Sequence, residues 1–202
     1  MISAARKEKI MKKILSLILI FTLALSFAAC KKNDPTKDVI PTGMKLASNP
    51  ELCEYSLFVP ESWIIDIQTS LTSARVGETD SSSLSVSAFT NASIPESDDM
   101  LAKYWESYTE DLKSIFDKKD DGSSTFTPSE PETITLKKGE KNVAAIKITY
   151  TASLSGTELK YIQVISYDNA YFYIMTFTTT PDGYIKNIDD FNSVIANFTF
   201  DN

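Results

Sequence analysis

The chain has 202 residues, with 20 Lys and Arg, 27 Asp and Glu, two Cys and no His. Its first 29 residues hold five of the basic residues and one acid, which leaves 15 basic and 26 acidic side chains and a net charge of −11 for the rest. A surface this acidic repels nucleic-acid phosphate, which excludes DNA and RNA binding. The lack of His excludes Ser-His-Asp and Cys-His catalysis and every His-ligated metal site.

The N-terminal segment has the layout of a secretory signal. Lys12 and Lys13 precede an uncharged run from Ile14 to Cys30 that is rich in Leu, Ile, Phe and Ala. A basic start, a short apolar stretch and small residues at its end are typical of such signals, and we predict that residues 1–29 are a signal peptide. The run is at the short limit for a spanning helix, so an uncleaved membrane anchor is the alternative. Met11 is an alternative start to Met1.

The end of this run carries a more specific pattern. Ser26-Phe27-Ala28-Ala29-Cys30 resembles the bacterial lipobox, although Phe27 stands where Leu is usual. The resemblance implies that Cys30 becomes the lipidated N-terminus and that acyl chains such as palmitate hold the protein in the cell membrane, on its extracytoplasmic face. Each buried CH₂ group contributes about 0.8 kcal/mol, so two or three chains give stable anchoring.

A linker and one domain follow the signal. Residues 30–44, which start at the lipidated Cys30, are polar, contain Pro35 and Pro41 and show no periodicity, so we expect a flexible linker. Residues 45–202 are then a single domain of ordinary size. With Cys30 lipidated, Cys53 has no partner in the chain, and we expect it to be a small buried apolar residue rather than a reactive thiol.

The first half of the domain predicts short strands and one helix. Ser97, after Pro95, suits the N-cap of a helix whose apolar residues recur at steps of three and four from Leu101 to Phe116. Asp120-Asp121-Gly122 is expected to end it. Four strands precede this helix, with turns at Pro60 and at residues 77–80: residues 55–59, 63–67, 71–76 and 84–88.

The second half predicts a sheet of long strands. Tight turns join the long strands and make them antiparallel. The last two are apolar on both faces and need cover on both, and a second helix with apolar residues from Tyr184 to Ile195 supplies it. The expected fold class is therefore α+β, a three-layer α/β/α sandwich around a central antiparallel sheet. The predicted strands are a short one at 133–136, long ones at 144–152, 159–167 and 171–177, and an edge strand at 198–200.

These elements lead to a family resemblance. The segment from Tyr55 to Trp63, with Phe58, Val59, Pro60 and Trp63, resembles the "f-x-v-P-x-x-W" opening of PsbP-like domains. The 101–116 helix, residues 160–178 and residues 197–200 are similar to later parts of the same family, so that the match covers most of residues 52–200. The resemblance implies a central antiparallel sheet with helices on both sides. It also implies a protein-binding accessory rather than an enzyme, and it assigns no binding residue to this chain.

Other motifs are better explained without a special function. Asp117, Asp121 and Gly122 fit the start of an EF-hand loop, but Lys119 and Pro128 stand where calcium ligands are needed, so we expect no metal site there. We find no catalytic constellation and expect no cofactor. The expectation for six aromatic residues is burial rather than ligand binding, with the tyrosines covered by the second helix: Trp63, Trp105, Tyr161, Tyr167, Tyr171 and Tyr173.

The sequence therefore favours a lipid-anchored extracytoplasmic accessory protein, non-catalytic, that binds another protein of the cell envelope. The membrane contact is the N-terminal lipid on Cys30. The alternative is a small-ligand or cation-binding lipoprotein, for which the acidic surface and the aromatic strands are the motivation. The ligand-binding residues are not identified by any motif in the sequence.

Overall fold

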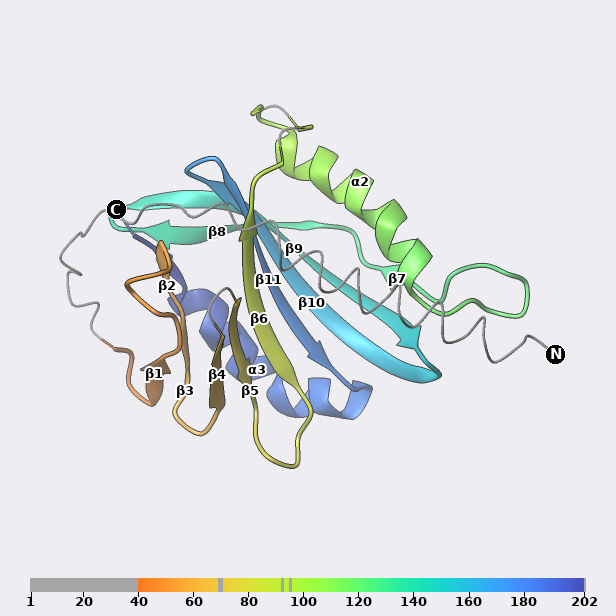
Figure 1. Ribbon diagram of the computed structural model, residues 1–202, viewed down its shortest axis with the longest axis horizontal. Coiled ribbons are helices and arrows are strands. Elements are labelled where there is room, and N and C mark those ends of the chain that lie inside the picture. Colours follow the sequence, from red (N-terminus) through yellow and green to blue (C-terminus); the bar gives the residue numbers. More distant parts are fainter. Residues whose placement is uncertain (1–39, 69–70, 92, 95, 202) are drawn as a thin grey trace.

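The computed structural model describes residues 40–68, 71–91, 93–94 and 96–201 (Figure 1). The predicted signal peptide, Cys30 and most of the linker lie outside the described residues. In the described part of the chain, no helix has both the length and the apolar character that a membrane span requires.

The core of the fold is a curled, mostly antiparallel sheet of ten strands (Figure 1). Its strand order is β2-β12-β8-β9-β10-β11-β6-β5-β4, with β7 beside β9. Strands β1 (Met44–Leu46) and β3 (Phe58–Pro60) form a separate antiparallel pair. The ten strands of the sheet are β2 (Tyr55–Ser56), β4 (Ile64–Gln68), β5 (Leu71–Arg75), β6 (Ser83–Phe89), β7 (Thr127–Pro128), β8 (Glu132–Lys138), β9 (Lys141–Leu154), β10 (Thr157–Asp168), β11 (Tyr171–Thr179) and β12 (Thr199–Phe200).

The long hairpins follow from local sequence. Strands β9, β10 and β11 are joined by two-residue turns, and the central parts of β10 and β11 are buried on both faces. Ser155 and Gly156 both have positive φ, as do Asn169 and Ala170, which is the backbone geometry that two-residue hairpin turns require. The predicted antiparallel order of these three strands is confirmed by their pairing.

Two helices accompany the sheet in the described part of the chain, and their N-termini differ. Helix α3 (Pro181–Asn197) begins at the N-cap Thr180, whose hydroxyl accepts a hydrogen bond from the Gly183 amide at 3.1 Å. Helix α2 (Met100–Ile115) begins after Asp99, which makes no side-chain capping bond. The prediction that Ser97 caps this helix is wrong, because the Ser97 hydroxyl instead donates to the Asp99 carboxylate at 2.7 Å.

Each face of the sheet carries its own apolar core. Ile162 and Val164 of β10 pack into the cluster that contains Phe191 of α3, whereas Tyr161 and Ile165, which alternate with them, pack into the cluster that contains α2. Figure 1 shows α2 and α3 on different sides of the sheet. The mixed α+β class and the central, mostly antiparallel sheet are thus confirmed.

The aromatic residues singled out from the sequence are distributed over both cores. Trp63 is buried in the α3-side core and stacks on Phe177. Trp105 is half-buried against the α2-side core. The prediction that the second helix covers the tyrosines is wrong for Tyr161 and Tyr167, which belong to the α2-side core, while Tyr171 and Tyr173 belong to the α3-side core.

Two further predictions need correction. The predicted strand 55–59 is divided between β2 and β3, which pair in different sheets. The closing strand β12 is not at an edge, because Thr199 and Phe200 pair antiparallel with β2 on one side and parallel with β8 on the other. Cys53 is half-buried, and its thiol lies 3.6 Å from the Thr72 hydroxyl.

Candidate partner-binding groove

One strand of the sheet keeps an open edge in the middle of the strand order. Strand β8 pairs with β9 along its whole length, from Glu132 to Lys138. On its other side β12 pairs only with Lys137 and Lys138. In the described part of the chain, residues 132–136 therefore have no strand on this side, and their outward-facing backbone groups are available to a partner.

The way in which α3 ends explains this opening. The helix stops at Asn197, Phe198 takes up an extended conformation, and β12 is only two residues long. Because β12 begins only at Thr199, it pairs with the last two residues of β8 and, within the described residues, leaves the first five without a strand on this side. The C-terminal half of α3 lies beside them instead and forms the opposite wall of a groove.

This groove has a volume of about 250 Å³ and is lined by β8, β9 and α3. Its apolar part includes Ile134, Leu136 and Ile195, which also belong to the α3-side core. Its polar part includes the ammonium groups of two lysines and the side-chain amides of two asparagines. The full lining is Ile134, Thr135, Leu136, Lys137, Asn142, Lys147, Asn192, Ile195 and Ala196.

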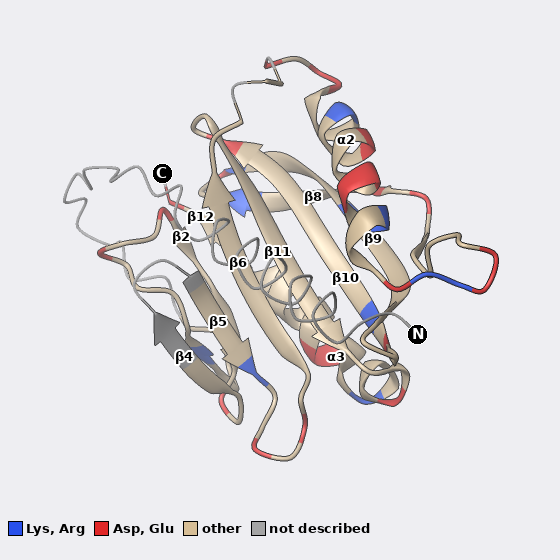
Figure 2. Cartoon of the chain, turned by 45° about the vertical axis from the view of Figure 1, so that its right-hand side comes forward, with Lys and Arg blue, Asp and Glu red and all other residues tan. Residues whose placement is uncertain are grey.

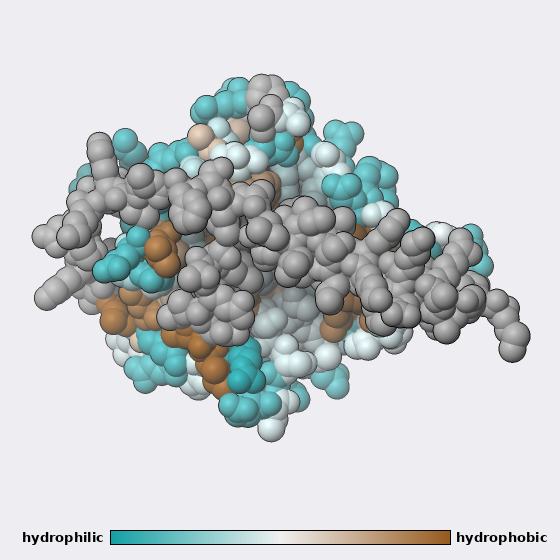
Figure 3. All heavy atoms as spheres, in the orientation of Figure 1, coloured by the Kyte–Doolittle hydropathy of each residue, from teal (hydrophilic) through white to brown (hydrophobic). Residues whose placement is uncertain are grey.

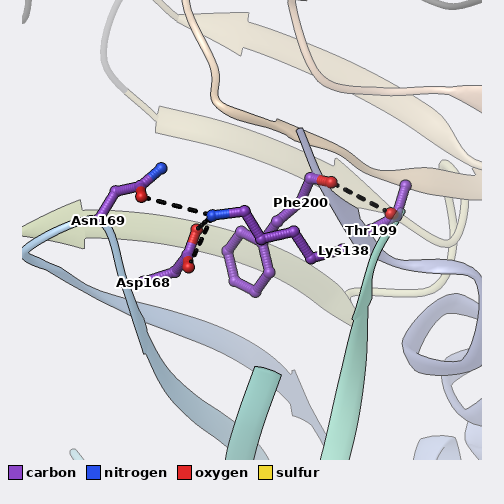
Figure 4. Close-up of polar contacts among 5 residues, drawn as sticks. All are labelled: Lys138, Asp168, Asn169, Thr199 and Phe200. Carbon is purple, nitrogen blue, oxygen red and sulfur yellow. Dashed lines mark hydrogen bonds and ion pairs between the residues drawn. The ribbon is translucent and has the colours of Figure 1, made fainter. Parts of the chain in front are cut away.

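The end of β8 is held by an ion pair (Figure 4). Lys138 Nζ donates to both carboxylate oxygens of Asp168, at 2.9 and 2.7 Å, and lies 3.4 Å from Asn169 Oδ1. The Lys138 and Asp168 side chains are only 19% and 15% exposed. Figure 4 shows the Phe200 ring beside the Lys138 side chain. The pair joins the end of β8 to the β10–β11 turn and so fixes one end of the groove.

The groove differs in charge from the rest of the molecule. Its lining has two lysines, Lys137 and Lys147, and no Asp or Glu. Lys137 is exposed, and Lys147 lies 3.6 Å from the carboxylate of Glu132, which is itself largely exposed. Figure 2 shows acidic residues spread over α2 and the exposed loops. The groove lining thus carries a small excess of positive charge on an otherwise acidic protein, which favours an anionic partner.

The loop that faintly suggested a calcium site has other contacts. Asp117 accepts a hydrogen bond from the Gly156 amide at 2.8 Å, and Asp121 accepts from the Ser123 amide at 2.9 Å. Hydrogen bonds from Ser123 lower the pKa of Asp121. Among the described residues there is no group of three or more His, Cys, Asp or Glu side chains that could hold a metal ion.

The α2 face has a polar contact that the sequence did not suggest. Gln163 of β10 is buried and donates to Tyr108 of α2 and to Thr176 of β11, at 3.3 and 3.1 Å. Burial raises the pKa of Tyr161 to about 12 and also raises the pKa of Tyr108. These phenols therefore stay protonated at neutral pH and serve as neutral packing groups.

A second surface of the molecule is apolar. Figure 3 shows hydrophobic residues gathered over the region of β1, β3 and β4. Ile64 and Ile65 of β4 are half-buried there, and β4 is the last strand of the sheet. Leu52 and Ile185 are among the large apolar side chains that are exposed.

Comparison with known proteins identifies the fold. No protein-family model and no curated protein matches the sequence. The structure is similar to cyanobacterial PsbP (CyanoP) of Synechocystis sp. PCC 6803, with a TM-score of 0.56 and 14% identity over 86% of this chain and 98% of that one. The chain therefore has a PsbP-like fold, as the Tyr55–Trp63 segment predicts.

Two other solved structures score lower. LpqN, which is involved in cell envelope biogenesis of Mycobacterium tuberculosis, has a TM-score of 0.49 and 15% identity over 72% of this chain and 82% of its own. The protein PA94 of Pseudomonas aeruginosa has a TM-score of 0.47 and 18% identity over 74% and 92%. The fold assignment rests on CyanoP.

Proposed function

We propose that this protein is a lipid-anchored, extracytoplasmic accessory protein that has no catalytic activity and binds another protein of the cell envelope. The observation that carries the anchoring is the Ser26–Cys30 motif at the end of the apolar run. In this proposal residues 1–29 are removed, Cys30 receives acyl chains including palmitate, and the linker holds the domain off the membrane. The domain is a three-layer α/β/α sandwich with α2 and α3 as its outer layers.

The groove beside β8 supports the binding part of the proposal. It offers an open strand edge, an apolar wall on α3 and two lysines within one site. Protein-binding sites commonly combine apolar contact with backbone hydrogen bonds of this kind. Its volume of about 250 Å³ is below the range of roughly 300–1,000 Å³ that is usual for small-molecule pockets.

The anchoring is tested by metabolic labelling with an alkyne analogue of palmitate. Wild-type protein is expected to take up the label, and Cys30→Ser is expected to lose it completely. Cys53→Ser is the matched control and is expected to keep it, because Cys53 lies inside the folded domain. Label that persists in Cys30→Ser would contradict lipidation at this residue.

The binding is tested by crosslinking on intact cells, with the protein expressed from its own signal. One dominant envelope protein should be recovered with wild type and lost, or greatly reduced, with Cys30→Ser. Recovery of no protein in either form would contradict the accessory function.

The alternative of a small-ligand-binding lipoprotein also draws on the groove, because a polar rim around an apolar floor suits a small anion. A ligand in hundredfold excess over its dissociation constant stabilises the native state by about 2.7 kcal/mol. Our proposal predicts no such shift when the protein is melted with a panel of small anions and cations. A shift that Lys137→Gln abolishes would favour the alternative.

A further inference from the structure

We propose that the open edge of β8 captures an extended, acidic segment of the partner protein, which adds to the sheet as a strand beside α3. The inference rests on the proposed function, since it names the part of the partner that is recognised. It goes beyond that function because it fixes the backbone geometry and the charge of the bound segment.

The first step of the argument is the strand edge itself. An unpaired edge presents a row of N–H and C=O groups that favours pairing with another chain. Edges are usually protected by Pro, by bulges, by charged side chains or by a covering helix or loop. Residues 132–136 contain no Pro and one charged residue, Glu132, and α3 approaches them only on the face into which Ile134 and Leu136 point. β12 already pairs with the last two residues of β8, which shows that this side accepts a strand.

The second step concerns side chains. Successive residues of an added strand point to opposite faces. One set would face the apolar wall made by Ile134, Leu136 and Ile195, and the other set would face solvent and the polar rim. The bound segment should therefore alternate apolar and charged residues.

The third step is charge. Lys137 and Lys147 line the groove, and the exposed Lys141 follows at the start of β9. Glu132 at the start of the edge lies 3.6 Å from Lys147, so Lys137 and Lys141 supply the excess positive charge, which favours an acidic segment over a basic one. The protein's own linker is a poor occupant, since residues 31–43 have three Lys and two Asp.

The fourth step is rigidity. The Lys138–Asp168 pair fixes the end of β8, and the Thr180 cap fixes the start of α3, so that both walls of the groove are held before a partner arrives. A preorganised edge loses little conformational freedom on binding, and most of the ordering cost falls on the incoming segment.

The test uses the full chain in detergent micelles and three eight-residue probe peptides with blocked ends. The first is a Val-Glu repeat, the second is a Val-Lys repeat, and the third is the Val-Glu repeat with alternate backbone amides methylated, which removes the donors that strand addition needs. Fluorescence anisotropy measures affinity. Hydrogen exchange measures protection of residues 132–136.

We expect the Val-Glu peptide to bind at about millimolar concentration or tighter and to slow exchange within residues 132–136. The Val-Lys and methylated peptides should bind at least about tenfold more weakly. Lys137→Glu and Ala196→Trp, which reverse the rim charge and fill the groove wall, should each weaken binding of the Val-Glu peptide about tenfold. Lys119→Glu and Ile185→Trp are matched exposed controls that should change nothing.

Several results would overturn the proposal. These are no binding of the Val-Glu peptide, equal binding of the methylated peptide, insensitivity to both groove variants, or preferential binding to vesicles of anionic phospholipid. Concentration-dependent dimerisation that Ala196→Trp abolishes would assign the edge to a second copy instead. If the intact-cell crosslink recovers a partner that Ala196→Trp leaves unchanged, the accessory function stands while the role of the β8 edge fails.

Discussion

The two faces of the sheet bury comparable aromatic clusters, but they hold their helices by different means. On the α3 side, hydrogen bonds fix the helix. Thr180 caps its N-terminus. In a buried cluster of polar side chains, the Ser82 and Thr179 hydroxyls lie 2.7 Å apart and the Asn187 amide donates to Ser82 at 3.2 Å. On the α2 side the contacts are mainly aromatic. Tyr104 stacks on Phe172 with ring centroids 4.7 Å apart.

This difference bears on function. Hydrogen bonds between buried groups have narrow geometry, so they fix the position of α3 and with it the wall of the groove. On the α2 side one such bond, from Gln163 to Tyr108 at 3.3 Å, joins the helix to the sheet, and most of the other contacts are aromatic. The face with more of these directional contacts is thus the one that carries the proposed binding site.

The largest effects should come from removing one ring on each face. Phe172 and Phe177 lie on the same strand, β11, on opposite faces, and both are completely buried. Phe172→Ala and Phe177→Ala should each lower the free energy of unfolding by about 4 kcal/mol, measured by urea denaturation. The exposed Ile185→Ala should change it by less than about 0.5 kcal/mol. A loss below about 1 kcal/mol for Phe172→Ala would show that the α2 face is loosely packed.

The next effect tests the polar contacts of α3. A Cβ atom on Gly183 would collide with Thr179 Oγ1 and would lie 2.9 Å from Ser82 Oγ. Gly183→Ala should therefore cost about 3 kcal/mol, since it overpacks the site and separates buried hydrogen-bonding groups. Gly77→Ala is the control, because nothing lies within 4 Å of its Cβ position. Equal stability of the two variants would mean that α3 can shift freely.

A smaller effect compares one ion pair on each side of the sheet. Lys138→Met removes the half-buried bidentate contact with Asp168 and should cost about 2 kcal/mol. Lys113→Met removes the 2.7 Å pair with Glu110 on the exposed surface of α2 and should cost less than about 0.5 kcal/mol. The loss for Lys138→Met should persist at high salt, whereas that for Lys113→Met should disappear. Equal losses in urea denaturation would remove the distinction.

Much of this fold could be predicted from local patterns. Alternation defined β10 and β11, turn residues defined the hairpins, and the spacing from Tyr184 to Ile195 defined α3. These features depend on residues close together in sequence. The prediction of Ser97 as the N-cap was wrong because several polar residues before α2 are suitable N-caps. Asp99 occupies the N-cap position, and its carboxylate makes no capping hydrogen bond.

Features that depend on distant contacts could not be predicted. A two-residue strand such as β12 has no periodicity, so its place between β2 and β8 is set by where α3 delivers the chain. The groove requires Ile134 to meet Ile195, which no local motif encodes. Tyr161 lies in the core beneath α2. The sequence predicts two helices but does not indicate which of them covers which face of the sheet.

The smallest effect is a pH dependence at the start of the α3 contacts. The pKa of Asp80 is lowered below the ordinary value, first by a side-chain hydrogen bond from Ser82 and then by the bonds from Asn187 Nδ2 at 3.0 Å and from the Ser82 amide at 2.8 Å. A carboxyl group with a lowered pKa in the folded state stabilises the protein above its unfolded pKa of about 3.9 and loses that contribution as pH falls through the folded value.

Wild type should therefore be more stable than Asp80→Asn at pH 7, and the gap should close as the pH falls from about 5 to about 2. Urea denaturation at several pH values measures it. Asp121→Asn, at a fully exposed carboxylate with a lowered pKa, is the control and should show a smaller gap at pH 7. A gap that is constant with pH would mean that the ionised form of Asp80 adds nothing to the contacts that fix α3, and that the neutral hydroxyl and amide groups hold the helix alone.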